Sequence, residues 1–429
     1  MRMENSFTQL IDYELYLFIL IVVLGMLFGK LAGWLRLPDV ALFLIAGMIF
    51  GQAFHWIAEP SSSLTNQFIL IIGSTLILFD GGRNIRLSGL KHVWISVTLL
   101  SIPGVILTCG AVAAASHWFL GLPWLHALLL GAIISSTDPA TLIPVFKQVR
   151  IRTKVRETVE SESAFNDATG SILTFSLIAV LLGTEQVSAA SGIWQFVKTA
   201  LGGLAVGAVI GYAGAFLTAH VKIGFLRDYA TILMLAAALG SYLAGEHLGV
   251  SGFMATFTAG LIWGNSDVFK LHMEDKKQEM NHFSENVTVL MRMLIFILLG
   301  SQVNFPLLLK YLWPSLGIIF VFMFIARPLA VLVCTLPDRK AKWTWREIVF
   351  MFWVRETGVI PAALSGMVAG LGIAHADLIA SVTFMAVLIT ILFQASTTAF
   401  VARKLGLEEA AEGGSGGKDS VPSAEPRPQ

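Results

Sequence analysis

Apolar stretches long enough to cross a membrane recur along almost the whole chain. A transmembrane helix needs about 20 predominantly apolar residues, and thirteen segments approach or exceed this length. They lie at about 13–34, 39–58, 66–82, 93–118, 124–146, 157–182, 193–219, 228–247, 250–265, 286–303, 308–336, 345–370 and 377–402. Charged residues make up only 13% of the 429 residues, against about 25% in soluble domains. The sequence therefore predicts an all-α polytopic membrane protein.

The basic residues of the connecting segments test this count. Cytoplasmic loops of membrane proteins carry an excess of Lys and Arg. The connections that follow the odd-numbered segments hold 21 Lys and Arg residues, and the opposite side holds three, Arg2, Lys198 and Lys310. The alternation supports thirteen helices. It also predicts an outside N-terminus and a cytoplasmic C-terminus, in the plasma (inner) membrane.

Two of the thirteen segments are interrupted by proline and by charge. The fifth contains Asp138-Pro139, and the twelfth contains the run Arg355–Pro361. Proline removes a backbone donor and clashes with the preceding turn, so both helices are expected to be broken. In many transporters the broken helices of two inverted repeats meet at the binding site. The two segments hold equivalent places in two sets of six, so we expect inverted repeats with crossing helices 5 and 12.

The repeats are expected at about 13–182 and 228–402, with the seventh helix, about 193–219, as linker. Together they form a transmembrane domain over 1–407. Residues 408–429 are rich in Gly, Ser and Pro and contain too little apolar surface to fold, which predicts a disordered cytoplasmic tail.

The sixth segment places a polar strip inside an apolar helix. Ser163 and Asp167 are four residues apart and share a face, and Glu162 and Asn166 share the neighbouring one. A charge at the bilayer centre costs about 2.5–3.5 kcal/mol, so an intramembrane acid indicates an ion or proton site. Oxygens from this strip, from Thr137 and from the backbone near Asp138 suit a monovalent cation such as Na⁺. Protonation of Asp167 would release that cation, which is the basis of antiport.

Buried acids need counter-charges, and Arg327 and Arg355 lie in the eleventh and twelfth apolar segments. We expect Glu162 to pair with Arg355 and Arg327 to lie near the helix crossing. Asp80, at the end of the third segment, either lies on the cytoplasmic ion pathway or caps the helix end beside Arg83.

These motifs resemble the NhaP and NHE type of sodium/proton antiporters. The resemblance covers about residues 13–405, and its most specific part is Thr137-Asp138-Pro139 followed by Glu162-Ser163-x-x-Asn166-Asp167. It implies that Asp167 binds cation and proton, that Asn166, Thr137 and Asp138 shape the site, and that Ser163 adds an oxygen. It also implies that Glu162 is a structural acid paired with an arginine of helix 12, that Arg327 is the family's helix 11 arginine, that Asp80 lies near the ion path, and that the protein is a homodimer.

The resulting expectation is exchange of Na⁺ (or Li⁺) for H⁺, electroneutral with one proton for one cation, and not an enzymatic reaction. A K⁺/H⁺ antiporter is the alternative, because oxygen ligands do not by themselves select ion size. An intramembrane hydrolase or lipid-modifying enzyme would need a nucleophile with a base or a metal centre, and neither is evident. No cofactor and no nucleic acid is indicated, and the expected partners are membrane lipids and a second copy of the chain.

Overall fold

The computed structural model describes residues 2–35, 37–137, 149, 151–183, 189–219 and 226–408, with the side chains of 2–10 and 189–193 left aside. Within these ranges the regular elements are all helical, and one isolated β-bridge joins Ile151 to Glu408. The tail predicted from residue 408 onwards lies outside the described residues except for Glu408. The predicted all-α fold is confirmed.

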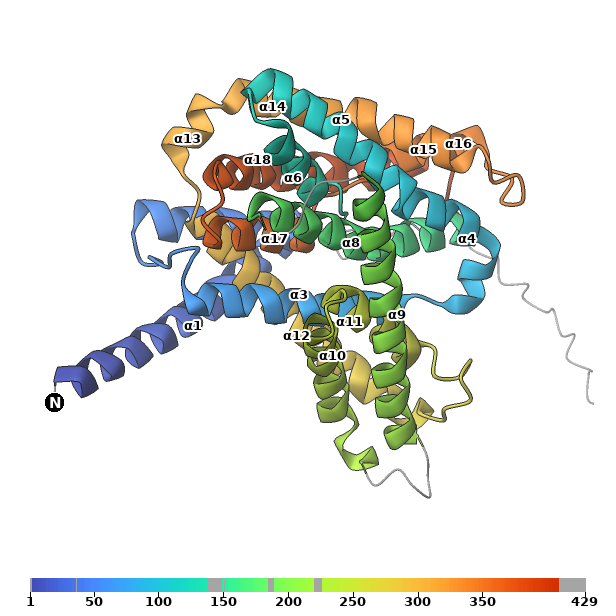
Figure 1. Ribbon diagram of the computed structural model, residues 1–429, viewed down its shortest axis with the longest axis horizontal. Coiled ribbons are helices and arrows are strands. Elements are labelled where there is room, and N and C mark those ends of the chain that lie inside the picture. Colours follow the sequence, from blue (N-terminus) through green and yellow to red (C-terminus); the bar gives the residue numbers. More distant parts are fainter. Residues whose placement is uncertain are drawn as a thin grey trace, which may run out of the picture.

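The helices follow one another along the chain as shown in Figure 1. In order they are α1 (Arg2–Leu35), α2 (Asp39–Met48), η1 (Ile49–Ala53), α3 (Leu64–Asn84), α4 (Leu87–Ser101), α5 (Pro103–Leu120), α6 (Trp124–Ile134), α8 (Thr153–Leu181), α9 (Ala189–Ala219), η2 (Arg227–Tyr229), α10 (Ala230–His247), α11 (Gly252–Gly264), α12 (Glu274–Ser301), α13 (Phe305–Lys310), α14 (Leu312–Val321), η3 (Phe322–Ala326), α15 (Arg327–Thr335), α16 (Trp345–Trp353), α17 (Val359–Gly370), α18 (Ala376–Ile389), η4 (Thr390–Ala395) and α19 (Ser396–Lys404). The segments η1, η3 and η4 are π-helical, and η2 is a 3₁₀ turn.

The helices occupy the positions predicted for the membrane spans. In the described part of the chain, nine helical stretches are long and apolar enough to cross a membrane. Four shorter apolar helices, at 39–53, 124–134, 252–264 and 359–370, fill the remaining four positions. The fourth predicted span, about 93–118, is instead a longer kinked pair, α4 and α5. The kink falls at Ile102 because Pro103 follows it and cannot donate to the preceding turn.

The broken helices lie between two groups of helices. In Figure 1, α5, α14 and α15 run along one edge, α8 lies beside α6 and α17 in the middle, and α3 lies on the other side next to α11. Helix α17 packs against α3 and α12 as well as against α6, α8 and α18. The second half of the interrupted twelfth span therefore contacts both groups.

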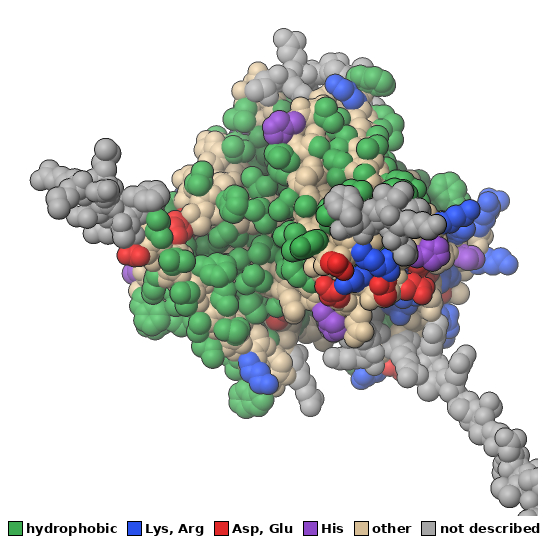
Figure 2. All heavy atoms as spheres, turned by 90° about the horizontal axis from the view of Figure 1, so that it is seen from below, with side chains coloured by type: hydrophobic (Ala, Val, Ile, Leu, Met, Phe, Trp, Pro, Cys, Tyr) green, Lys and Arg blue, Asp and Glu red, His purple; other side chains and the backbone are tan. Residues whose placement is uncertain are grey.

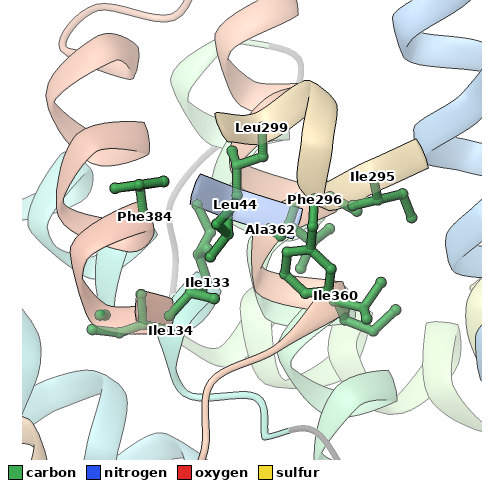
Figure 3. Packing of buried hydrophobic residues seen from close by; sticks show 14 of the residues in the cluster. Leu44, Ile133, Ile134, Ile295, Phe296, Leu299, Ile360, Ala362 and Phe384 are labelled. Carbon is green, nitrogen blue, oxygen red and sulfur yellow. The ribbon is translucent and has the colours of Figure 1, made fainter. Parts of the chain in front are cut away.

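An apolar cluster packs the two broken helices, α6 and α17, against α2, α12 and α18. Figure 3 shows Ile133 of α6, Ile360 of α17 and Phe384 of α18 packed with Leu44 of α2 and Phe296 of α12. All five side chains are at most 3% exposed. Burying a large apolar side chain contributes about 1.5–3 kcal/mol relative to exposing it, so this cluster holds both half-helices against the rest of the bundle.

Large hydrophobic side chains are exposed along many of the helices. Figure 2 shows broad hydrophobic surface on one face, with charged side chains gathered toward one side of it. Helix α1 alone exposes Leu15, Ile19 and Leu27 by 56–61%. Apolar exposure on this scale is unfavourable in water and is expected where lipid covers the protein. The protein is an integral membrane protein.

Helices α3 and α11 approach so closely that only glycine fits at their contact. A Cβ atom on Gly260 would lie 2.0 Å from the carbonyl oxygen of Phe79, and one on Gly264 would lie 1.9 Å from that of Arg83. Small residues spaced four apart are a common device for close helix packing in membranes. The pair Gly260 and Gly264 follows this spacing.

We predict that Gly260→Ala destabilises the protein, by about 1–3 kcal/mol, because its Cβ can be accommodated only if the backbones move apart. The measurement is the apparent Tm of the purified protein in detergent. Gly240→Ala in α10 is the matched control, since no atom lies within 4 Å of a Cβ there. Equal melting of the two variants would contradict the close packing of α3 on α11.

Candidate functional site

Helix α6 ends inside the bundle, as predicted for the fifth span. Its last helical residue is Ile134, Ser135 follows as its C-cap, and Ser136 and Thr137 are not helical although both are buried. Asp138 and Pro139, the predicted ligand and helix breaker, lie outside the described residues.

The side chain of Asn166 on α8 holds the unwound end of α6. Its Oδ1 accepts a hydrogen bond from the backbone N–H of Thr137 at 3.0 Å, and its Nδ2 donates to Thr137 Oγ1 at 2.8 Å. Thr137 Oγ1 in turn donates to Ser163 Oγ at 2.9 Å. Three of the predicted site residues therefore form one hydrogen-bonded cluster with each side chain at most 6% exposed.

The face of α8 that carries Ser163 and Asn166 also contacts the unwound segment after α6. A Cβ on Gly170 would lie 2.2 Å from Ser136 Oγ, so α8 touches the unwound segment there without an intervening side chain. Positions 163, 166, 167 and 170 lie on one helical strip, which places Asp167 beside Asn166 on the side facing the break. Asp167 is 6% exposed.

The twelfth span is broken over five residues. Helix α16 ends at Trp353, α17 begins at Val359, and the segment 354–358 between them is non-helical and buried. The N–H of Thr357 donates to Thr390 Oγ1 at 3.0 Å. Thr390 opens the π-helical segment η4, so an irregular helix supplies the acceptor that the unwound chain needs.

Glu162 forms a buried ion pair with Arg327, not with Arg355. The two guanidinium Nη atoms bind the two carboxylate oxygens, with Arg327 Nη2 at 3.0 Å from Glu162 Oε2. The side chains are 1% and 2% exposed. The expected pairing of Glu162 with Arg355 is therefore wrong. Arg327, the first residue of α15, reaches the acid because η3 and α15 pack against α16 next to the break.

Arg327 and Arg355 also cap the ends of broken helices. Arg327 donates from Nε to the carbonyl of Met351 at 2.8 Å and from Nη2 to that of Val354 at 3.2 Å. Arg355 donates to the carbonyl of Ser135, at the end of α6, at 2.5 Å. The last carbonyls of a helix have no intrahelical partner and carry partial negative charge. The two guanidinium groups supply both the donors and the positive charge.

Asp80 lies at the end of α3 in a network of its own. It accepts hydrogen bonds from Arg83 at 2.8 Å, Asn84 at 3.1 Å and Ser284 at 2.6 Å. The helix-end pair with Arg83, one of the two expected arrangements, is present. A role in the ion pathway stays a prediction.

One intramembrane ion pair is absent from the sequence-based expectations. Arg292 of α12 contacts Asp39, the first residue of α2, at 3.1 Å, and its side chain is 12% exposed. The signal was available, because Arg292 is a lone charge inside the predicted span 286–303. Its partner could not be read from the chain, since 253 positions separate the two.

This architecture, in which two interrupted helices meet at buried polar groups, is that of a secondary transporter. The chain belongs to the sodium/hydrogen exchanger family, whose model, described as "Sodium/hydrogen exchanger, transmembrane", matches residues 18–404.

Similar proteins include both sodium and potassium antiporters. The chain is 31% identical over 412 residues to Na(+)/H(+) antiporter 1 of Methanocaldococcus jannaschii, an alignment that covers 90% of this chain and 94% of that one. It is 32% identical over 357 residues to the K(+)/H(+) antiporter NhaP of Alkalimonas amylolytica, covering 81% of this chain but only 59% of that protein.

The fold is also that of a solved structure. The sodium proton antiporter MjNhaP1 from Methanocaldococcus jannaschii superposes with a TM-score of 0.83 at 29% identity, covering 92% of this chain and 99% of that chain. The family resemblance inferred from the sequence motifs is confirmed.

We predict that a double-mutant cycle will show strong coupling between Glu162 and Arg327 and much weaker coupling between Glu162 and Arg355. Removing one partner of a buried pair leaves an uncompensated charge and costs about 3–5 kcal/mol. Arg327→Met and Glu162→Gln should each lower the apparent Tm strongly, and the double variant should recover part of the loss.

The matched cycle uses Arg355→Met with Glu162→Gln. Nearly additive losses of stability are expected in this cycle, because Arg355 donates to the carbonyl of Ser135 while Glu162 binds Arg327. Coupling that appeared only in this second cycle would show that the pair seen between Arg327 and Glu162 is not the one that stabilises the protein.

Proposed function

We propose that the protein exchanges Na⁺ (or Li⁺) for H⁺, and that the two ions compete for Asp167. The observation that carries this proposal is the cluster of Asn166, Thr137 and Ser163, which presents amide and hydroxyl oxygens beside a buried acid at the end of an interrupted helix. Hard monovalent cations prefer oxygen ligands. Asp138 is proposed as a further contributor from the adjoining segment.

The transported cation must be held mainly by the charge of Asp167. The carboxyl end of a helix carries about half a negative charge, and at α6 the guanidinium of Arg355 balances this charge through the carbonyl of Ser135. Transporters place cations at such ends of broken helices. The sodium antiporters that this chain resembles over nine-tenths of its length support Na⁺ as the transported ion.

An exchange of one cation for one proton follows from the number of available acids on α8. Glu162 is neutralised by Arg327 in a bidentate pair, so it cannot release its partner cheaply to accept a transported ion. Asp167 is then the one α8 acid left for exchange in this cluster. A single carboxylate that alternates between one cation and one proton moves no net charge.

A K⁺/H⁺ exchanger is the second candidate. It is favoured by the similarity to the K(+)/H(+) antiporter NhaP of Alkalimonas amylolytica, and oxygen ligands alone do not separate the two ions. Transport by purified protein in proteoliposomes, driven in turn by Na⁺, Li⁺ and K⁺, decides between the two. Exchange with K⁺ and none with Na⁺ would replace the first proposal by the second.

We further propose that the protein works as a homodimer in the plasma (inner) membrane, with its N-terminus outside and its C-terminus in the cytoplasm. The distribution of Lys and Arg supports the orientation. The apolar surface exposed along α1 is available to lipid or to a second copy.

We predict that Asp167→Asn abolishes cation-induced proton movement while leaving the protein folded, because an amide neither ionises nor balances the charge of a cation. The measurement is dye quenching in everted vesicles. Asp377→Asn, at an exposed position in the first turn of α18, is the matched control and should keep full activity. Retained exchange by the Asp167 variant would exclude this acid as the shared site.

Competition between cation and proton also predicts a pH dependence. Where Asp167 is mostly protonated without cation, each unit fall in pH should raise the apparent KM for the cation about tenfold and leave the maximal rate unchanged, since only the ionised fraction binds. Initial rates measured over a range of cation concentrations at each pH give both quantities. A maximal rate that falls with KM constant would contradict competition.

We predict that the rate of exchange is unchanged when a membrane potential is imposed on the proteoliposomes. A potential of 100 mV does about 2.3 kcal/mol of work on each elementary charge moved, and one-for-one exchange moves none. Acceleration by an inside-negative or inside-positive potential would show that more than one proton moves per cation.

A further inference from the structure

A polar pocket of about 490 Å³ lies at the ends of α3 and α11 and the start of α12. Its lining includes Arg83, Arg86, Trp263, Asp267 and Lys277. None of the residues of the Thr137 cluster lines it, so it is separate from the proposed exchange site. Its size falls within the range of about 300–1,000 Å³ that small-molecule pockets occupy.

The charge of the lining is positive. Three cations, Arg83, Arg86 and Lys277, face a single acid, Asp267. Asp267 lies 3.4 Å from Lys277, and both side chains are about half exposed. Ion pairs with this exposure contribute little, so Lys277 remains available to another anion. Asp80 neutralises part of Arg83 from behind the pocket, at 2.8 Å.

Arg83 is the buried cation of the lining, with its side chain 8% exposed. Its Nη2 atom donates to Asp80 at 2.8 Å, and its Nη1 atom donates to Asn281, which also lines the pocket. Its Nε atom makes no hydrogen bond to any part of the chain that the structure describes. Arg83 is therefore fixed in the wall by its neighbours, and Arg86 and Lys277 are the two lining cations exposed to a ligand.

The turn between α3 and α4, which carries the lining residue Arg86, is fixed by hydrogen bonds to α11. Asn265, at the end of α11, accepts from the N–H of Leu87 at 2.9 Å and donates to the carbonyl of Ile85 at 2.8 Å. The turn that carries Arg86 between these two residues is thereby fixed to α11. A preordered cationic wall loses less entropy when an anion binds.

We propose that this pocket binds a phosphate group, supplied by an anionic phospholipid headgroup or by a soluble polyphosphate. Guanidinium groups match phosphate oxygens in a two-pronged geometry, and Arg86 and Lys277 place two exposed cations in the lining. The pocket adjoins connections rich in Lys and Arg, on the side proposed to be cytoplasmic, where both sources are present. Binding is independent of the exchange proposed for Asp167.

The test uses the full chain, purified in neutral detergent and reconstituted in nanodiscs. Thermal stabilisation is measured with pyrophosphate in phosphatidylcholine nanodiscs, and separately with phosphatidylglycerol added to the nanodiscs. Saturable stabilisation by pyrophosphate supports a soluble ligand. Stabilisation by phosphatidylglycerol alone supports a lipid headgroup.

The double variant Arg86→Gln with Lys277→Gln should weaken the stabilising ligand at least about tenfold, which corresponds to about 1.4 kcal/mol. The matched control, Lys270→Gln with Lys276→Gln, removes two nearby cations that do not line the pocket and should bind as the unmodified chain does. The single variant Arg86→Gln removes one exposed lining cation and should weaken binding severalfold. This variant provides the test if the double variant does not fold.

Two results overturn the proposal. In the first, neither pyrophosphate nor phosphatidylglycerol stabilises the protein. In the second, stabilisation occurs but is equal in the unmodified chain, the pocket variants and the matched control, which would reduce it to general attraction between anions and a basic surface.

Discussion

The ends of two interrupted helices inside an apolar bundle are the constraint on which this structure depends. Each such end exposes carbonyl groups that water would otherwise satisfy. Arg355 donates to the end of α6, and Arg327 donates to two carbonyls at the end of α16. Arg327 also carries the ion pair with Glu162 of α8. Arg327 therefore joins α8, the helix with the polar strip, to the break between α16 and α17. Arg355, which lies in that break, joins it to the broken end of α6.

This arrangement separates two acids of one helix into different tasks. Glu162 and Asp167 are five residues apart, but Glu162 lies on the side of α8 that meets Arg327, and Asp167 lies on the strip that meets the unwound end of α6. A bidentate pair with arginine holds the first acid in place. Hydroxyl and amide groups lie beside the second, where ion exchange is proposed. The different roles proposed for Glu162 and Asp167 thus follow from the groups beside each carboxylate, since both are carboxylic acids.

Much of the fold and of the site could be predicted from local patterns. The thirteen apolar segments, the proline-marked breaks and the strip from Ser163 to Asp167 depend on composition and helical spacing, which a chain carries in its own order. The contact of Thr137 with Asn166 could be expected because both lie beside the same break. The partner of Glu162 could not. Arg327 and Arg355 were equally available as arginines in apolar segments, and the choice depended on which of them the packing of η3 and α15 brings to α8. The pairing of Arg292 with Asp39 was missed for the same reason.

The sequence by itself determined that this chain crosses a membrane repeatedly and that two of its helices break. It also predicted that Asp167, Asn166 and the hydroxyls of Ser163 and Thr137 lie close together. These properties follow from transfer free energies and from the missing donor of proline, which act on short stretches of chain. Only the tertiary structure decided which acid pairs with which base, and where glycine must admit a neighbouring backbone. It alone also brought Arg83, Arg86 and Lys277 together around one pocket. Those outcomes depend on distances between residues far apart in the chain, and burial makes each such distance energetically decisive.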